Sequence, residues 1–210
     1  MSDRPPSKST RALRLHAVAD QASFCTRCEL HEHATQTVFG AGRATARLMF
    51  VGEQPGDKED RTGEPFVGPA GTILDRALEQ LGIERRSVYL TNVVKHFRWE
   101  ASGKRRIHKT PGVEHVRVCL PWFDQELAIV RPEVVVCLGA IAARALLGPS
   151  FRLTAQRGRL VQWDRPGRVL ATVHPASVLR SDDRGAAFTA FLDDLAVAAD
   201  ATRVAAATRR

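Results

Sequence analysis

The 210-residue sequence contains no uninterrupted apolar run of the length, about 18 residues, that a membrane-spanning helix requires. Its polar N-terminal segment, which is rich in Pro and Ser, also lacks the apolar stretch that follows the charges of a secretory signal. No internal repeat is evident, and a chain of this length is sufficient for one domain with a buried core. We therefore expect a single-domain protein of the cytoplasm that does not bind membranes.

Acidic residues are too few to balance the basic ones. The chain has 31 Lys and Arg against 23 Asp and Glu, which gives a net charge of +8, and its pI is about 10.0. A domain this basic favours a polyanionic partner, and nucleic acid is the usual one. A soluble surface with a net charge away from zero gives the same composition, so charge alone leaves both interpretations open.

The apolar pattern indicates an α/β fold. Short, nearly continuous apolar runs are typical of strands buried on both faces, and they cover residues 48–52, 88–94, 134–139 and 169–173. Helical patterns cover residues 12–22, 70–81, 113–130, 140–147 and 186–207. Because strands alternate with helices, we expect a three-layer αβα sandwich around a central, mostly parallel four-stranded sheet. A lesser fifth strand is expected over residues 159–163, a disordered tail over residues 1–11, and the single domain over residues 12–205.

Polar side chains accompany the ends of these strands. Glu53 follows the first strand, Asn92 lies in the second, and His174 follows the fourth. Ligands of open α/β sheets bind beyond the carboxyl ends of the strands, so these side chains are expected to converge at one rim. The sequence therefore predicts a site that contains a carboxylate, an amide and an imidazole.

Cysteine is scarce, and only two of the four cysteines form a CxxC pair. Cys25 pairs with Cys28, whereas Cys119 and Cys137 are single and distant. The lack of a second pair argues against the usual zinc knuckles, and disulfides are not expected in a cytoplasmic chain. One pair with two scattered thiolates is compatible with a closed four-sulfur site for an iron–sulfur cluster or zinc. Alternatively, Cys137 is only a small buried residue of a strand.

Four segments resemble the motifs of uracil-DNA glycosylases, in the same order along the chain. They are residues 52–57 (GEQPGD), residues 63–71 (GEPFVGPAG), Asn92, and residues 174–177 (HPAS). The cysteine pattern resembles the iron–sulfur type, family 4 and its relatives. This resemblance implies a uracil-DNA glycosylase-like fold, with a 4Fe-4S cluster that the four cysteines hold and that clamps the N-terminal segment to the sheet. It also implies uracil-containing DNA as the partner, single-stranded DNA included, and we expect the protein to be a monomer.

Within this superfamily the sequence most resembles the UdgX group. Gln54 in the first motif, the acidic run at residues 57–60 (DKED) and the basic segment at residues 104–108 (KRRIH) carry this resemblance. Residue 176 is Ala where the UdgX pattern has Ser, which leaves Ser177 as the candidate phosphate contact. The resemblance implies that His108 bonds covalently to the deoxyribose after uracil is released.

The expected base pocket has a physical rationale. A base must leave the duplex stack, or lie in a single strand, before an enzyme can reach its glycosidic bond. Phe66 offers an aromatic platform, and Asn92 matches the O4 and N3–H edge of uracil but not the reversed pattern of cytosine. His174 can donate to uracil O2, where negative charge accumulates as the base departs. Taken singly, Phe66 is typical of a core and Asn92 of ordinary structure. The other residues expected at the base are Gln54, Gly56 and Asp57.

Glu53 and His108 are the expected reactive pair. In a hydrolase Glu53 orients the water that captures the oxocarbenium-like sugar. Neutral His108 is a better nucleophile than water, and we expect Glu53 to hydrogen-bond to it and to stabilise the adduct, so that the protein reacts once. The residues expected to contact DNA are Lys95, Lys104, Arg105, Arg106, Ser177 and Arg180.

Two other functions stay open at this point. One is a conventional turnover glycosylase of the family 4 type, which releases uracil repeatedly. The other is a noncatalytic iron–sulfur module for nucleic-acid binding, in which the basic segment at residues 104–108 only grips phosphates and His108 is incidental.

Overall fold

The computed structural model describes residues 8–207, and its centre is a six-stranded sheet in the order β1-β3-β2-β6-β8-β7. The central strands run parallel and are β3 (Tyr89–Asn92), β2 (Leu48–Gly52), β6 (Val134–Leu138) and β8 (Arg168–Thr172). They correspond to the four predicted apolar runs. The edge strands β1 (Ala41–Gly42) and β7 (Leu160–Gln162) pair antiparallel to the sheet, and only β7 has a counterpart among the sequence predictions.

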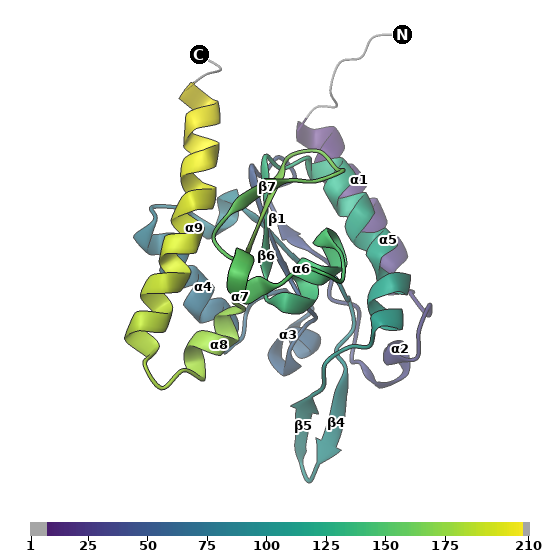
Figure 1. Ribbon diagram of the computed structural model, residues 1–210. Helices are drawn as coiled ribbons and strands as arrows, with labels where there is room; N and C mark the ends of the chain where they lie inside the picture. Colours follow the sequence, from purple (N-terminus) through teal and green to yellow (C-terminus); the bar gives the residue numbers. More distant parts are fainter. Residues whose placement is uncertain (1–7, 208–210) are drawn as a thin grey trace.

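Helices cover both faces of the sheet (Figure 1). Met49 and Val51 share an apolar core with α1 (Lys8–Ser23), α5 (Val113–Val130) and α6 (Ala140–Leu147). Leu48 and Phe50 share the opposite core with α4 (Pro69–Gln80) and α9 (Arg184–Ala207). Successive side chains of a strand point to opposite faces, so each central strand serves two cores. The predicted three-layer αβα sandwich is thereby confirmed.

Short helices connect these layers. They are α2 (Leu30–His33), α3 (Asp57–Thr62), α7 (Leu153–Gln156), α8 (Pro175–Leu179) and the 3₁₀ turn Arg85–Ser87. Helix α1 begins at Lys8, so the predicted tail is wrong for residues 8–11, and residues 1–7 lie outside the described part of the chain. None of the described helices is both long and apolar enough to cross a membrane.

A two-stranded antiparallel hairpin projects from the body of the molecule (Figure 1). It consists of β4 (Trp99–Ser102) and β5 (Arg105–His108), which Gly103 and Lys104 connect. Gly103 has a φ of 59°, which a tight hairpin turn accommodates readily because glycine has no side chain to clash. The sequence analysis assigns no strand to the basic segment at residues 104–108, whereas in the structure strand pairing places His108 opposite Trp99 at the base of a regular element.

Candidate active site

A cavity of about 810 Å³ lies beyond the carboxyl ends of β2, β3 and β8. The sheet contributes Glu53, Asn92 and His174 to its wall, as expected for the carboxyl edge of parallel strands. The hairpin adds His108, and Arg180 follows α8. The other predicted base-pocket residues in the wall are Gln54, Gly56, Asp57 and Phe66. The structure thus brings the predicted pocket and the reactive pair together, while their roles stay predictions.

Burial gives Glu53 unusual acid–base properties. It directly follows β2, and its side chain is 20% exposed. Oε1 is buried and has no hydrogen-bond partner among the described residues. Burial raises the pKa of Glu53 to about 6, because a poorly solvated carboxylate favours its protonated form. Glu53 therefore lies in the wall of the cavity with one carboxylate oxygen that is buried and unpaired.

His108 stands next to this carboxylate. Its Nε2 lies 3.8 Å from Glu53 Oε1, and its side chain is about half exposed. This distance is too long for the predicted hydrogen bond, so the two groups lie side by side without one. Burial, and then the positive charge of Arg180, lowers the pKa of His108. The imidazole is therefore neutral at pH 7 and has a free lone pair on one ring nitrogen.

His174 is fixed in one tautomer. It caps the N-terminus of α8, where its Nδ1 accepts a hydrogen bond from Ala176 N at 3.2 Å. The ring proton is consequently on Nε2, which makes that nitrogen a donor. Burial, with smaller contributions from His108 and Arg180, lowers the pKa of His174 to about 4. At neutral pH this residue is an uncharged hydrogen-bond donor at the cavity.

The side chains of Phe66 and Asn92 both lie against Gly52. The Phe66 ring stacks against the ring of His174 at 6.4 Å between centroids. A Cβ on Gly52 would lie 2.3 Å from Asn92 Oδ1 and 2.8 Å from Phe66 Cζ, so only glycine leaves space for both side chains. Phe66 adopts a left-handed backbone conformation with a φ of 56°, and Arg85 donates to its carbonyl at 2.9 Å. A strained, externally held conformation is typical of a functional residue.

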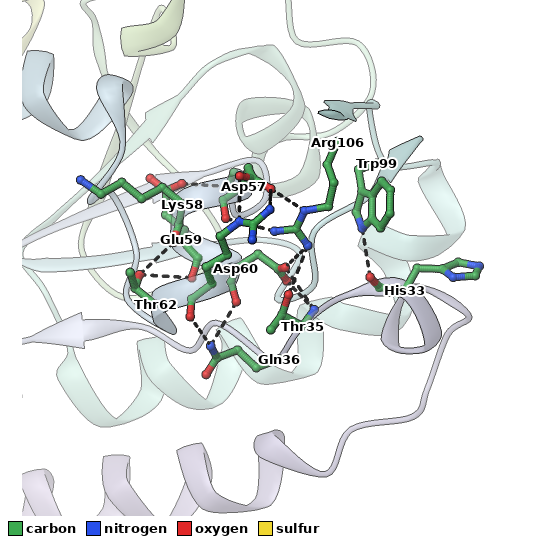
Figure 2. A network of polar contacts seen from close by, with 12 residues as sticks. His33, Thr35, Gln36, Asp57, Lys58, Glu59, Asp60, Thr62, Trp99 and Arg106 are labelled. Atoms are coloured by element: carbon green, nitrogen blue, oxygen red, sulfur yellow. Dashed lines mark hydrogen bonds and ion pairs between the residues drawn. The ribbon is translucent and has the colours of Figure 1, made fainter. Parts of the chain in front are cut away.

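Arg106 fastens the hairpin to the body of the protein, as Figure 2 shows. Its guanidinium pairs with Asp57 and, at 2.6 Å, with Asp60. Its side chain is only 12% exposed, and it also lies over the ring of Trp99. The ring nitrogen of Trp99 donates in turn to His33 O at 3.0 Å. The predicted DNA contact of Arg106 is therefore corrected, because this guanidinium is already bound inside the protein.

Gln54 fastens the two ends of the hairpin segment. Its Nε2 donates to Arg98 O at 3.2 Å and to Lys109 O at 3.0 Å. Its Oε1 accepts from Arg98 N at 3.1 Å. Arg98 precedes β4 and Lys109 follows β5, so one side chain sets the spacing of the two chain segments at the root of the hairpin. The side chain of Gln54 thus helps to position His108, and the predicted contact of residue 54 with the base stays a prediction.

Glu59 is a site residue that the sequence analysis misses. Its Oε1 accepts from Gly68 N at 2.8 Å, and its Oε2 accepts from Gly56 N at 3.2 Å. One carboxylate thus ties the loop that carries Phe66 to the loop that follows β2. A glutamate three residues after a helix N-cap is a capping signal that points to part of this arrangement.

The remaining residues that were predicted to contact DNA differ in their exposure. Lys104, Arg105 and Arg180 are exposed, as phosphate binding requires. Ser177 is partly buried, and its hydroxyl already donates to His174 O at 2.7 Å. Lys95 is fully buried and pairs with Glu126, so its predicted contact with DNA is wrong.

The four cysteines do not assemble into one site. Burial raises the pKa of Cys119 to about 11, and the charges of Cys25 and Cys28 also act on it. Burial alone raises the pKa of Cys137 to about 12, and none of the other thiols acts on it. Cys137 packs in the apolar core instead. This agrees with the alternative that Cys137 is only a small buried residue of a strand. Among residues 8–207, no group of three or more His, Cys, Asp or Glu side chains is arranged to hold a metal ion, so the predicted four-cysteine set does not fit a cluster.

Comparison with known proteins gives consistent matches. The profile of the Uracil DNA glycosylase superfamily matches residues 39–196. A Type-4 uracil-DNA glycosylase of Thermotoga maritima is 36% identical over 173 residues, which cover 82% of this chain and 86% of that protein. A Type-4 uracil-DNA glycosylase of Pyrobaculum aerophilum is 37% identical over 163 residues, with coverages of 74% and 80%. A Type-5 uracil-DNA glycosylase of the same organism is 37% identical over 153 residues, with coverages of 64% and 63%.

Proposed function

Because the chain belongs to the uracil DNA glycosylase superfamily, we propose that it excises uracil from DNA and then remains bonded to the deoxyribose through His108. The observation that carries this proposal is the position of His108. A hairpin anchored by Arg106 and Gln54 holds its neutral imidazole at the cavity, 3.8 Å from a buried carboxylate. A covalent bond through this histidine is what the resemblance to the UdgX group implies.

Uracil recognition follows from the pocket chemistry. The Phe66 ring provides a surface for stacking, and the Asn92 amide pairs with O4 and N3–H of the base. The reversed donors and acceptors of cytosine leave buried groups unpaired, which is a strong basis for rejection. The Nε2–H of His174 donates to O2 and stabilises the negative charge of the departing base.

The covalent step is a substitution at C1′. The bond between C1′ and uracil N1 breaks, and its electron pair leaves with the base. A lone pair of the His108 imidazole forms the new bond to C1′ of the oxocarbenium-like sugar. The imidazole gives up one ring proton, and uracil takes up one proton and leaves as a neutral base. The Glu53 carboxylate stabilises the positive charge on the sugar and then on the imidazole ring.

A conventional turnover glycosylase is the second candidate. In that case Glu53, which is partly exposed beside the cavity, orients a water molecule toward C1′. A noncatalytic nucleic-acid module is the third candidate. It gains support from the exposed Lys104 and Arg105 at the tip of the hairpin, but it assigns no purpose to the buried Oε1 of Glu53, which has no hydrogen-bond partner among the described residues.

One experiment separates these candidates. The wild type, His108→Ala and, as a matched control, His16→Ala, which changes an exposed histidine of α1, are each incubated with uracil-containing single-stranded DNA. A denaturing gel then resolves free from bonded DNA. A denaturant-resistant shift in the wild type and in His16→Ala, but not in His108→Ala, supports the proposal. Unshifted DNA that breaks at the uracil after alkali treatment supports the turnover glycosylase, and unchanged DNA supports the noncatalytic module.

We extend the proposal to an iron–sulfur cofactor rather than zinc. Its ligands would be Cys25, Cys28 and Cys119, which would have to move together around it, because no group of three such side chains is already arranged to hold a metal among the described residues. The mutual electrostatic influence of these three thiols supports it. Cys137 is left out of the ligand set. The cofactor joins α5 to the segment after α1, and no step of the reaction depends on it.

We also propose a monomer that acts in the cytoplasm, with single-stranded DNA as its substrate.

A further inference from the structure

A buried ion pair lies directly behind Asn92. Lys95 Nζ is 2.7 Å from Glu126 Oε2, and both side chains are 0% exposed. Neither residue lines the cavity. A buried pair is weak evidence for stability, because the free energy of removing two charges from water can exceed their attraction. Such a pair next to a binding pocket therefore suggests a role in positioning.

Glu126 is held from several directions. Its carboxylate accepts hydrogen bonds from Gly40 N at 2.9 Å, from Tyr89 Oη at 3.1 Å and from Thr91 Oγ1 at 2.9 Å. These donors lie before β1 and in β3, whereas Glu126 itself belongs to α5. The carboxylate thus has a fixed place relative to the sheet.

Lys95 connects the carboxylate of Glu126 to the backbone of Asn92. Its Nζ donates to Asn92 O at 2.8 Å and to Thr91 Oγ1 at 2.6 Å, in addition to Glu126. All three protons of the ammonium group are therefore used. A hydrogen bond from a charged donor is stronger than a neutral one, so the carbonyl of Asn92 is held firmly.

The backbone beyond Asn92 is held as well. Val93 N donates to Gly52 O and Val94 N donates to Glu53 O, each at 3.0 Å. The side-chain oxygen of Asn92 meanwhile lies against Gly52. The peptide that follows Asn92 is thus fixed at both its carbonyl and its N–H, which fixes the direction of the side-chain amide toward the cavity.

We propose that Lys95 and Glu126 are positioning residues for uracil recognition, with Lys95 holding the Asn92 carbonyl so that its side-chain amide meets the edge of the base. This inference rests on the proposed function. Loss of the anchor lets the amide move, and hydrogen-bond pairing with uracil weakens, while contacts with the sugar and phosphates do not depend on it.

The test separates affinity for the base from affinity for DNA. The double variant Lys95→Met/Glu126→Gln removes both charges, and a glutamine amide at position 126 still accepts from Gly40 N. Affinity is measured for free uracil and for single-stranded DNA that carries a tetrahydrofuran abasic-site analogue. We expect uracil affinity to fall about tenfold, as for a lost hydrogen bond, and affinity for the abasic DNA to stay within about twofold. The matched control is Arg47→Met/Glu133→Gln, which removes an ion pair that precedes β2 and β6 and does not line the cavity, and which should leave uracil affinity unchanged.

A second measurement places the effect on Asn92. In an Asn92→Ala background, the double variant is expected to cause no additional loss of uracil affinity, because coupled residues are not additive. If the double variant does not fold, Thr91→Val, which removes one partner of Lys95 Nζ, is expected to give a smaller loss with the same selectivity for the base.

Equal losses for uracil and abasic DNA, or full additivity with Asn92→Ala, overturn the inference and leave Lys95 and Glu126 a structural role only. A folded wild type that binds abasic DNA but neither binds nor excises uracil overturns the proposed function instead. The wild-type measurements therefore distinguish the two failures.

Discussion

Burial sets the protonation states of three side chains at the cavity. It raises the pKa of Glu53 to about 6, lowers the pKa of His174 to about 4, and lowers that of His108. At pH 7 these three side chains are therefore one carboxylate and two neutral imidazoles. Adduct formation needs this combination, because the nucleophile must be neutral while the group that stabilises the cationic sugar must be charged.

The first prediction concerns pH. The single-turnover rate of crosslinking is expected to decrease below about pH 6, where Glu53 becomes protonated. Glu53→Gln should lower the crosslinking rate on the plateau above pH 6 by about 100-fold, which is a typical contribution of a positioned acid–base group. In this variant the fall of the rate at low pH, the acid limb of the pH–rate profile, should no longer lie near pH 6. Rates measured between pH 4.5 and 8 check this. An unchanged limb in the variant contradicts the assignment of the limb to Glu53.

The second prediction concerns stability. The folded protein raises the pKa of Glu53 from its ordinary 4.5 to about 6, so the folded state binds the proton more tightly than the unfolded chain. The resulting destabilisation is absent below pH 4.5, develops up to about pH 6 and is complete above it, reaching about 2 kcal/mol. Glu53→Gln should therefore raise the free energy of unfolding at pH 8 but not at pH 4. Denaturant titrations at both pH values check this, and an equal gain at both speaks against burial as the cause.

At the scale of secondary-structure elements, the β4–β5 hairpin is the element that carries His108, the proposed nucleophile. Its root is fixed by Gln54, and its face is fixed by the pairs of Arg106 with Asp57 and Asp60. Without these anchors, His108 belongs to a projecting two-stranded element, and such an element is marginally stable alone. The anchors therefore give a rigid support to His108, the proposed nucleophile.

The third prediction tests these anchors. Arg106→Gln should reduce the yield of covalent adduct at least about tenfold, since small displacements of a nucleophile cost that much or more. Excision of uracil, measured by alkaline cleavage, should persist because Asn92 and His174 belong to the sheet edge. The neighbouring Arg105→Gln, at an exposed position, serves as the control and should keep the adduct yield. Equal loss in both variants indicates that the basic residues act through charge and not through anchoring.

At the scale of the whole molecule, alternation of apolar runs was sufficient to predict the layers, the central strands and the rim where Glu53, Asn92 and His174 meet. Periodicity reports which side chains are buried, and parallel strands have their carboxyl ends on one side. Tertiary partners were not predictable in the same way. Arg106 and Lys95 look like DNA contacts in a basic chain, but the carboxylates that bind them lie 46 and 31 positions away in the sequence.

Cys137 illustrates the same difficulty. Four cysteines suggest one four-sulfur site, yet the middle strand of a sandwich also favours a small buried side chain, and the sequence does not distinguish the two. The fourth prediction follows: Cys119→Ala should lose iron and visible absorbance after anaerobic purification, whereas Cys137→Ala should keep both. Loss of iron in Cys137→Ala, or a colourless wild type that contains zinc, contradicts the proposed ligand set.

The central claim is a bond between the imidazole of His108 and the sugar. Mass spectrometry of a tryptic digest tests it most directly, because cleavage after Arg106 and Lys109 isolates residues 107–109. After reaction with a uracil-containing oligonucleotide and nuclease trimming, this peptide is expected to carry a deoxyribose phosphate without the base, with the fragment ions placing it on His108. An unmodified peptide from the shifted band, or the sugar on another residue, contradicts the account.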